Sequence, residues 1–265
     1  MTIQAEDENP EERLVKSADR VRDLGEVFTP AATVQEMLDL LPPEMWLPHP
    51  APTFLEPACG DGNFLVAILA RKLEAIAEAA GRGELPAGST EDAIQFHGLE
   101  ALASIYAVDL SIDNIVGGVP GHEIGARTRL VTLFADWHHR ATGKRLSRRS
   151  VALHSAEWIV EHNVLIGNML EFDAEGKPTG RDNLPLLDYT WSPETLSVSI
   201  DRTTFGAVLA TEAASVADAP SMDSLWSNGP ESLWSGKASQ IKNADRTAAP
   251  ELSGPMRNGT RRNGG

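Results

Sequence analysis

The chain has 265 residues, of which 42% are hydrophobic and 23% are charged, proportions typical of a folded globular protein. No run approaches the roughly 18 apolar residues that a membrane-spanning helix needs, which excludes an integral helical membrane protein. Its 38 Asp and Glu residues against 23 Lys and Arg residues give a formal net charge of −15, so DNA phosphates repel the chain as a whole. Any contact with DNA therefore requires a local basic patch or a partner.

Three regions follow one another along the chain. Residues 1–24 predict a charged helical leader, residues 25–212 a compact domain, and residues 213–265 a mostly disordered tail that is poor in large apolar residues. The polar, acidic start lacks the basic and apolar stretches of a secretory signal, so we expect a cytoplasmic protein. Within the tail, Asp-Ser-Leu-Trp-Ser at 223–227 is echoed by Glu-Ser-Leu-Trp-Ser at 231–235. The two boxes indicate docking motifs for a protein partner, or a chance similarity within a biased segment.

Helix and strand patterns alternate through the compact domain. Helices are predicted at residues 32–41, 64–80, 91–102, 112–116, 127–139 and 151–161, and strands at 53–56, 104–109 and 163–166. Pro42 and Pro43 end the first helix. Strands that alternate with helices predict an α/β fold with a mainly parallel sheet and helices on both faces.

The central motif is Phe-Leu-Glu-Pro-Ala-Cys-Gly-Asp-Gly-Asn at residues 54–63, where a hydrophobic strand runs through a glycine loop into a helix. Ligands of doubly wound sheets bind at this position, beyond the carboxyl ends of the strands. Phosphate-binding versions need a third glycine or Gly-Lys-Ser/Thr, and neither is present. Glu56 and Asp61 would repel a pyrophosphate and suit a ligand with a positive centre, such as a sulfonium.

Three further positions have both a functional and a structural interpretation. Asp109 ends the second strand, where it accepts the hydroxyls of a ribose or caps the next helix. Phe28 and Thr29, in Gly-Glu-Val-Phe-Thr-Pro at 25–30, close over a ligand or form an ordinary helix start. Asn168, in Ile-Gly-Asn-Met-Leu at 166–170, binds an adenine amino group or stabilises a turn.

Together with Ala-Val-Asp at 107–109, these segments resemble the S-adenosylmethionine-binding half of N6-adenine DNA methyltransferases from restriction–modification systems. The resemblance covers roughly residues 21–172. It implies a Rossmann-like S-adenosylmethionine-dependent methyltransferase core in residues 25–212, with S-adenosyl-L-methionine as cofactor. It also implies that Asp109 holds the ribose and Asn168 lies near the adenine ring. The methionine part would contact Phe28, Thr29 and Pro30, and the loop would be lined by Glu56, Ala58, Gly60 and Gly62.

One element of that family's pattern is missing. Its catalytic motif, Asn/Asp-Pro-Pro followed by an aromatic residue, holds the target amino group and stacks on the flipped base. No such string follows Asn168, and the nearest segment is Asp-Asn-Leu-Pro-Leu-Leu-Asp-Tyr at 182–189. Asp182, Asn183 and Tyr189 are therefore the candidates for the acceptor and stacking roles.

The expected function is methyl transfer to a flipped-out adenine, with DNA bound directly or through a specificity or partner subunit, and with no metal and no membrane. The alternatives are a non-catalytic cofactor-binding subunit or degenerate module of a restriction–modification or anti-restriction system, and a methyltransferase for RNA or protein. A dehydrogenase is disfavoured by the missing third glycine. A basic segment is a candidate contact with the DNA backbone, or a solvated loop between helices: Arg140, Lys144, Arg145, Arg148 and Arg149.

The remaining conspicuous side chains have structural interpretations. The chain has a single cysteine, Cys59, which excludes an internal disulfide framework. Cys59 is interpreted as a small packing residue in the loop. Tryptophans 137, 158 and 191 are expected in the core or at its edge. Four histidines have spacings that match no metal-ligand pattern and are interpreted as solvated or capping residues: His138, His139, His154 and His162.

Overall fold

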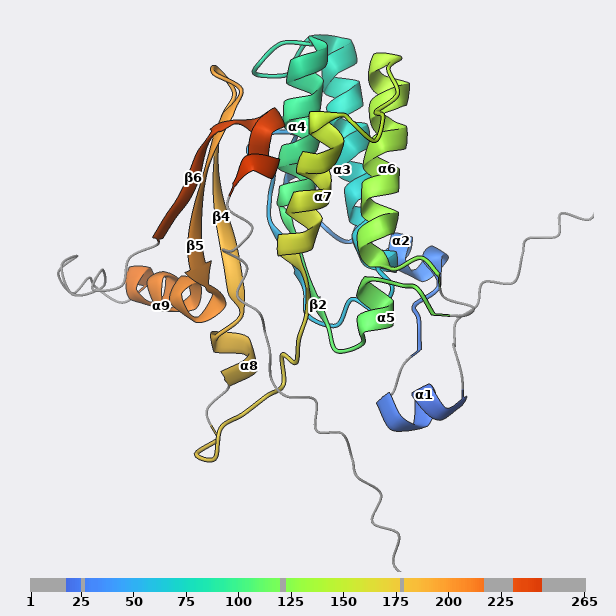
Figure 1. Ribbon diagram of the computed structural model, residues 1–265, viewed down its shortest axis with the longest axis vertical. Helices are drawn as coiled ribbons and strands as arrows, with labels where there is room; N and C mark the ends of the chain where they lie inside the picture. The colour runs from blue at the N-terminus through green and yellow to red at the C-terminus, as the bar shows by residue number, and fades with distance from the viewer. Residues whose placement is uncertain (1–17, 25–26, 120–122, 177–178, 217–230, 245–265) are drawn as a thin grey trace, which may run out of the picture.

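The computed structural model describes residues 18–24, 27–119, 123–176, 179–216 and 231–244 (Figure 1). Within them the chain is a mixed α/β protein with one parallel and one antiparallel three-stranded sheet. The parallel sheet has the order β1 (Phe54–Glu56), β2 (Ile105–Asp109), β3 (Val164–Ile166), which confirms the three predicted strands. Glu56 pairs with Ala107, and Asp109 pairs with Ile166, so all three strands end at the same edge of the sheet.

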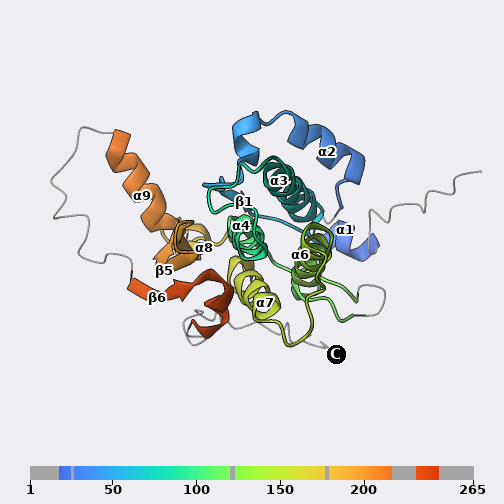
Figure 2. The ribbon, with the colours of Figure 1, turned by 90° about the horizontal axis from the view of Figure 1, so that it is seen from above.

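The helices between these strands form a single group. Helices α3 (Asn63–Arg82) and α4 (Glu91–Ala103) connect β1 to β2, and helices α6 (Ala126–Thr142) and α7 (Val151–Asn163) connect β2 to β3. The four pack against one another in one group, as Figure 2 shows from above, with α4 on the side of the antiparallel sheet. Helices α3, α4 and α7 contact β2, and α7 also contacts β3, so this group packs onto the parallel sheet.

A second sheet was not predicted. Strands β4 (Pro185–Ser192), β5 (Ser197–Thr204) and β6 (Glu231–Lys237) pair antiparallel in that order, to the left of α4 and α7 in Figure 1. Because three of the six strands in the described residues are antiparallel, the expected mainly parallel sheet is corrected to two sheets of opposite type. The alternation of Ser-Val-Ser-Ile at 197–200 buries Val198 and Ile200, a period of two that is typical of a strand.

The expected disorder of residues 213–265 was wrong for residues 231–244. The second of the two repeated boxes forms β6, and the next residues form the 3-10 helix η3 (Ala238–Asn243). Ile241 is fully buried, and Ser155 of α7 donates a hydrogen bond to the Ser239 carbonyl oxygen (2.9 Å). The pairing partner β5 lies far away along the chain, which is why local composition did not reveal this segment. The first box and the arginines at 257–262 lie outside the described residues.

The other elements are short or peripheral. Helix α1 (Ala18–Leu24) lies within the expected leader, whose residues 1–17 lie outside the described part. The rest are α2 (Ala31–Asp39), η1 (Pro43–Trp46), α5 (Ile112–Ile115), α8 (Thr179–Asp182) and α9 (Phe205–Val216). None of the helices in the described residues has the length and apolar character to span a bilayer.

The largest fully buried side chain belongs to a tryptophan, as expected. Trp158 is 0% exposed and its ring stacks on His162 at a centroid distance of 3.9 Å. Trp137 is also buried, and Trp191 of β4 meets Phe96 of α4 edge to face at 5.3 Å. The Trp191 contact joins the antiparallel sheet to the helix group. A further link is the hydrogen bond that the Tyr106 hydroxyl of β2 donates to the Leu187 carbonyl oxygen of β4 (2.5 Å).

Candidate cofactor-binding site

The glycine loop leaves β1 and turns directly into α3. Two glycines have positive φ angles, +54° at Gly60 and +93° at Gly62, a region that side chains with a Cβ atom rarely occupy. Gly62 precedes the first residue of α3, and a Cβ atom there would lie 3.0 Å from the Ala126 Cβ of α6. The Cys59 amide donates to the Val108 carbonyl oxygen (3.0 Å), which holds the loop against the end of β2. The positive φ angles and the close approach of α6 therefore both require glycine in this turn.

Asp109 lies directly beside the loop. Its Oδ2 atom accepts a hydrogen bond from the Gly60 amide at 2.9 Å. Its Oδ1 atom accepts from the Ser111 amide at 2.8 Å and from Asn114 Nδ2 at 2.9 Å. A carboxylate offers about four acceptor positions, so these three donors leave roughly one for a ligand. Asp109 therefore organises the loop and the start of α5, and it can hold both hydroxyls of a ribose only if one of these donors is displaced.

A cavity of about 180 Å³ opens next to the loop. Its wall is formed on one side by the segment before α2 and on the other by the loop and the start of α3. The Phe28 ring is buried against the loop, with Cε1 only 3.1 Å from where a Cβ atom of residue 60 would lie. Five of the nine residues expected at the cofactor are among its lining: Phe28, Thr29, Glu56, Ala58 and Gly60.

A pair of residues that sequence reasoning missed braces this wall. Asn63 Nδ2 donates to the Thr29 carbonyl oxygen (3.1 Å), and Arg129 of α6 donates to Asn63 Oδ1 (2.9 Å). Arg129 also donates to the Asp61 carbonyl oxygen (2.8 Å) and lies 3.1 Å from the Asp61 carboxylate. Asn63 directly follows the glycine loop in the sequence, so its role could have been predicted. The role of Arg129 could not have been predicted from the sequence, because it arises only when α6 packs beside the loop.

The charge of the cavity depends on Glu56. Burial raises the pKa of Glu56 above its ordinary value, and the hydrogen bond from the Ala58 amide (3.3 Å) partly offsets that rise. Asp61 is compensated by Arg129, whereas Glu56 has no cationic partner among the described residues. Burial and the nearby carboxylates also raise the pKa of the Cys59 thiol, so this side chain is kept protonated and is a poor nucleophile.

The other four expected cofactor residues do not line the cavity: Pro30, Gly62, Asp109 and Asn168. Pro30 precedes the first residue of α2, and its carbonyl oxygen accepts the Val34 amide (3.0 Å). Asn168 is exposed, and its Oδ1 atom accepts the Leu170 amide (3.0 Å). This hydrogen bond belongs to the turn after β3, which is the structural interpretation of this asparagine.

The three expected catalytic side chains are not brought to the glycine loop. Asp182, the last residue of α8, pairs with the neighbouring Arg181 (2.9 Å), and Asn183 is exposed just after it. The Tyr189 hydroxyl of β4 donates to Asn163 Oδ1 of α7 (3.0 Å). Burial raises the pKa of Tyr189 well above its ordinary value, and none of the three residues lines the cavity. Tyr189 is thus occupied in joining the antiparallel sheet to α7.

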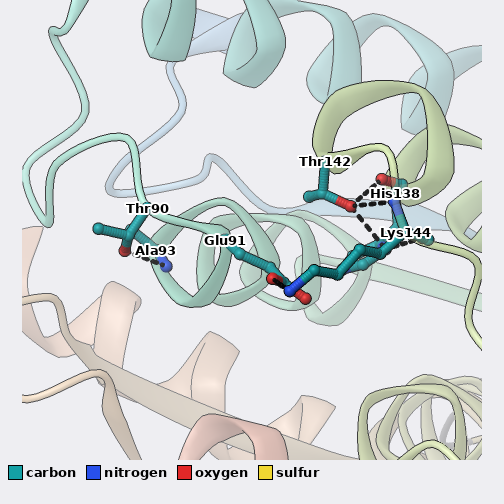
Figure 3. Close-up of polar contacts among 6 residues, drawn as sticks. All are labelled: Thr90, Glu91, Ala93, His138, Thr142 and Lys144. Carbon is teal, nitrogen blue, oxygen red and sulfur yellow. Dashed lines mark hydrogen bonds and ion pairs between the residues drawn. The ribbon is translucent and has the colours of Figure 1, made fainter.

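The expected basic contact lies at the far end of α6 from the loop. The helix begins against Gly62 and ends 17 residues later, a distance of about 25 Å at a rise of ~1.5 Å per residue. Figure 3 shows that Lys144, just beyond it, forms an ion pair with Glu91 at the start of α4. His138 is buried beneath, where its Nδ1 atom lies 3.1 Å from the Lys144 carbonyl oxygen and burial lowers its pKa. The four arginines of the segment are exposed: Arg140, Arg145, Arg148 and Arg149.

The chain matches no protein-family profile, no curated protein and no solved structure. The resemblance to adenine methyltransferases therefore depends on the residues of this chain and on their arrangement.

Proposed function

We propose that this chain is an S-adenosylmethionine-dependent methyltransferase-like protein of the adenine-N6 DNA class, with a Rossmann-like core in residues 25–212. The observation that carries the proposal is the cavity between Phe28 and the glycine loop, with Asp109 one hydrogen bond away (2.9 Å). A glycine turn and an acidic residue after neighbouring parallel strands form the position where nucleoside ligands bind.

The chemistry of the wall favours a cationic nucleoside over a dinucleotide. S-Adenosylmethionine supplies a sulfonium-activated methyl group and a positively charged amino group. Glu56 lies partly buried without a cationic partner in the described residues, so a positive ligand relieves its desolvation. A pyrophosphate would instead meet two carboxylates, Glu56 and Asp61, in the same wall.

Phe28 controls how much of a ligand fits. Pockets for drug-sized ligands measure about 300–1,000 Å³, and the cavity measures only about 180 Å³ with the Phe28 ring against Gly60. A whole cofactor therefore needs the ring to turn aside, or it lies partly outside the cavity. The expected closure of Phe28 over a ligand stays a prediction.

Calorimetric titration with S-adenosylmethionine tests the proposal. We expect binding to the intact chain, and a loss of roughly 1–3 kcal/mol for Asp109→Ala, which removes a charged hydrogen-bond acceptor. Asp188→Ala, at an exposed position of β4, is the matched control and leaves the affinity unchanged. Thermal unfolding of each variant separates lost binding from lost folding. Binding of NAD in place of S-adenosylmethionine, or equal affinities for the Asp109 variant and the intact chain, would contradict the proposal.

A non-catalytic module is the second candidate, and one observation favours it. Tyr189, the only aromatic side chain of the expected catalytic segment, is partly buried, and its hydroxyl donates a hydrogen bond to Asn163. Incubation with methyl-labelled cofactor and mixed-sequence DNA, RNA and protein distinguishes the candidates. Label in the adenine of DNA supports the enzyme, label in RNA or protein supports the other substrate class, and tight binding without any transfer supports the module.

A further inference from the structure

Three potential metal ligands meet at the opposite edge of the parallel sheet from the glycine loop. His49 lies in the segment that leads into β1, and His97 and Glu100 lie near the end of α4, just before β2 begins. Residues three apart on a helix share one face, so His97 and Glu100 point to the same side of α4. Sequence reasoning missed this group, because only the fold brings His49 to the helix.

The two imidazoles converge on one carboxylate. Glu100 Oε1 lies 2.7 Å from His49 Nδ1, and Glu100 Oε2 lies 3.1 Å from His97 Nδ1. The Ala51 amide also donates to Oε1 (3.2 Å), which fixes the orientation of the carboxylate. The His97 side chain is 0% exposed and that of Glu100 is 3% exposed, whereas the His49 side chain is 21% exposed. Ligand exchange with solvent is therefore possible from the His49 side.

The spacing and the types of these ligands fit a divalent transition ion. One ligand atom from each residue lies within 4.8 Å of the others. Around a tetrahedral ion with bonds of roughly 2.0–2.2 Å, ligand atoms stand about 3.3–3.6 Å apart, so small side-chain rotations suffice. Two histidines and one carboxylate are the protein ligands of many zinc sites and of non-haem iron sites.

The surroundings leave room for the remaining ligands. A cavity of about 290 Å³ is lined by His49 and Glu100 together with the polar side chains of Tyr106, Asp188 and Thr190. A polar cavity of this size holds ordered water. Lys72 interacts electrostatically with Glu100, and its Nζ atom donates a hydrogen bond to the Pro52 carbonyl oxygen (2.5 Å).

We propose that His49, His97 and Glu100 bind one divalent transition ion of the zinc type, with water from the adjacent cavity completing its coordination. The ion joins the segment before β1 to α4 and thereby fastens the amino edge of the parallel sheet. This proposal is independent of the cofactor proposal, since the two sites lie at opposite edges of the sheet and share no residue.

Zinc titration of the full chain, after dialysis against a chelator and then chelator-free buffer, tests the site. We expect one equivalent of Zn²⁺ to bind and the thermal unfolding midpoint to rise with it. Loss of a residue that only supports a ligand lowers metal affinity roughly 10- to 100-fold, so His49→Ala, which removes a ligand, is expected to lower it on the order of 100-fold or more. Glu100→Gln keeps the side-chain shape and is expected to weaken binding similarly. His154→Ala, a histidine of α7 outside the group, is the matched control.

Parallel titrations with Co²⁺ and with anaerobic Fe²⁺ identify the ion, and a Co²⁺ spectrum of the four-coordinate type is expected. Circular dichroism establishes that each variant is folded. The proposal is overturned if the folded chain takes up no stoichiometric ion. It is also overturned if His49→Ala binds Zn²⁺ as tightly as the intact chain and the control variant His154→Ala do. In either case the group is a buried hydrogen-bonded cluster that does not bind metal.

Discussion

At the residue scale, Glu56 decides the charge of the cavity beside the glycine loop. Asp109 is satisfied by three hydrogen-bond donors and Asp61 by Arg129, whereas Glu56 receives one hydrogen bond from the Ala58 amide. Burial therefore raises the Glu56 pKa. Such unrelieved desolvation is common where a protein is prepared for a ligand of opposite charge.

Glu56→Gln is expected to stabilise the ligand-free chain at about pH 7 and to weaken S-adenosylmethionine binding. A carboxyl group whose pKa is raised by folding disfavours the folded state once the pH exceeds both its folded and its unfolded pKa. Replacement by glutamine removes that disadvantage and so raises the free energy of unfolding at about pH 7. At about pH 3.5 the carboxyl is protonated in both states, so the replacement changes the free energy of unfolding little. Thermal unfolding at the two pH values measures the effect. A thermal unfolding midpoint at about pH 7 that is lower for Glu56→Gln than for the intact chain would contradict this expectation.

Tyr189→Phe is expected to lower the free energy of unfolding by about 1–3 kcal/mol, because the buried Asn163 Oδ1 atom loses its donor. Cofactor affinity should stay unchanged, since Tyr189 does not line the cavity. Denaturant unfolding and calorimetry measure the two quantities. If methyl transfer exists and disappears in a variant that unfolds normally, Tyr189 has a catalytic rather than a structural role.

At the element scale, β6 and η3 complete the packing of α7. Ala238 and Ile241 are buried, and the Ser155 hydroxyl of α7 both donates to Ser239 and accepts the Lys242 amide (3.4 Å). These contacts attach the last described segment to a helix of the parallel-sheet half. The two sheets are therefore joined through α7 as well as through Tyr106 and Trp191.

Ile241→Ala is accordingly expected to lower the free energy of unfolding by about 2–5 kcal/mol, the usual effect of removing a large aliphatic side chain from a core. Leu40→Ala, at a position that is 84% exposed, is the matched control and should change stability by less than about 0.5 kcal/mol. Urea unfolding curves of both variants provide the comparison. Equal free energies of unfolding for Ile241→Ala and Leu40→Ala would show that η3 does not contribute to the cooperative core.

At the scale of the whole molecule, charge and distance both weigh against tight DNA binding by this chain alone. The net charge is −15, and the exposed arginines after α6 lie about 25 Å from the glycine loop, given a rise of ~1.5 Å per residue over its 17 residues. Charge of this sign repels phosphate at long range. A DNA substrate would therefore need a basic partner surface near the cavity.

Fluorescence anisotropy with duplex DNA at about 150 mM salt should give a Kd weaker than about 10⁻⁴ M, the weak limit of ordinary non-specific DNA binders. Residual binding at low salt should disappear when Arg148 and Arg149 are replaced by alanine, because these side chains are exposed. A Kd near about 10⁻⁶ M at the higher salt concentration would contradict the need for a partner.

The sequence alone was sufficient for the strand–turn–helix around Gly60 and Gly62 and for the position of Asp109 beside it. The glycines, the apolar strand and the start of α3 are contiguous, so their local conformational preferences determine the turn. Strand ends in a parallel sheet meet at one edge, so an acidic residue after β2 had to lie near the loop after β1.

Only the tertiary structure decided the pairing of β4, β5 and β6, the structural position of Tyr189, and the meeting of His49 with His97 and Glu100. Each depends on contacts between residues far apart in the chain, such as Tyr189 with Asn163 and Ser197 with Lys237. Local propensity does not encode such contacts, because burial and pairing against a distant partner select among conformations that are locally similar in free energy.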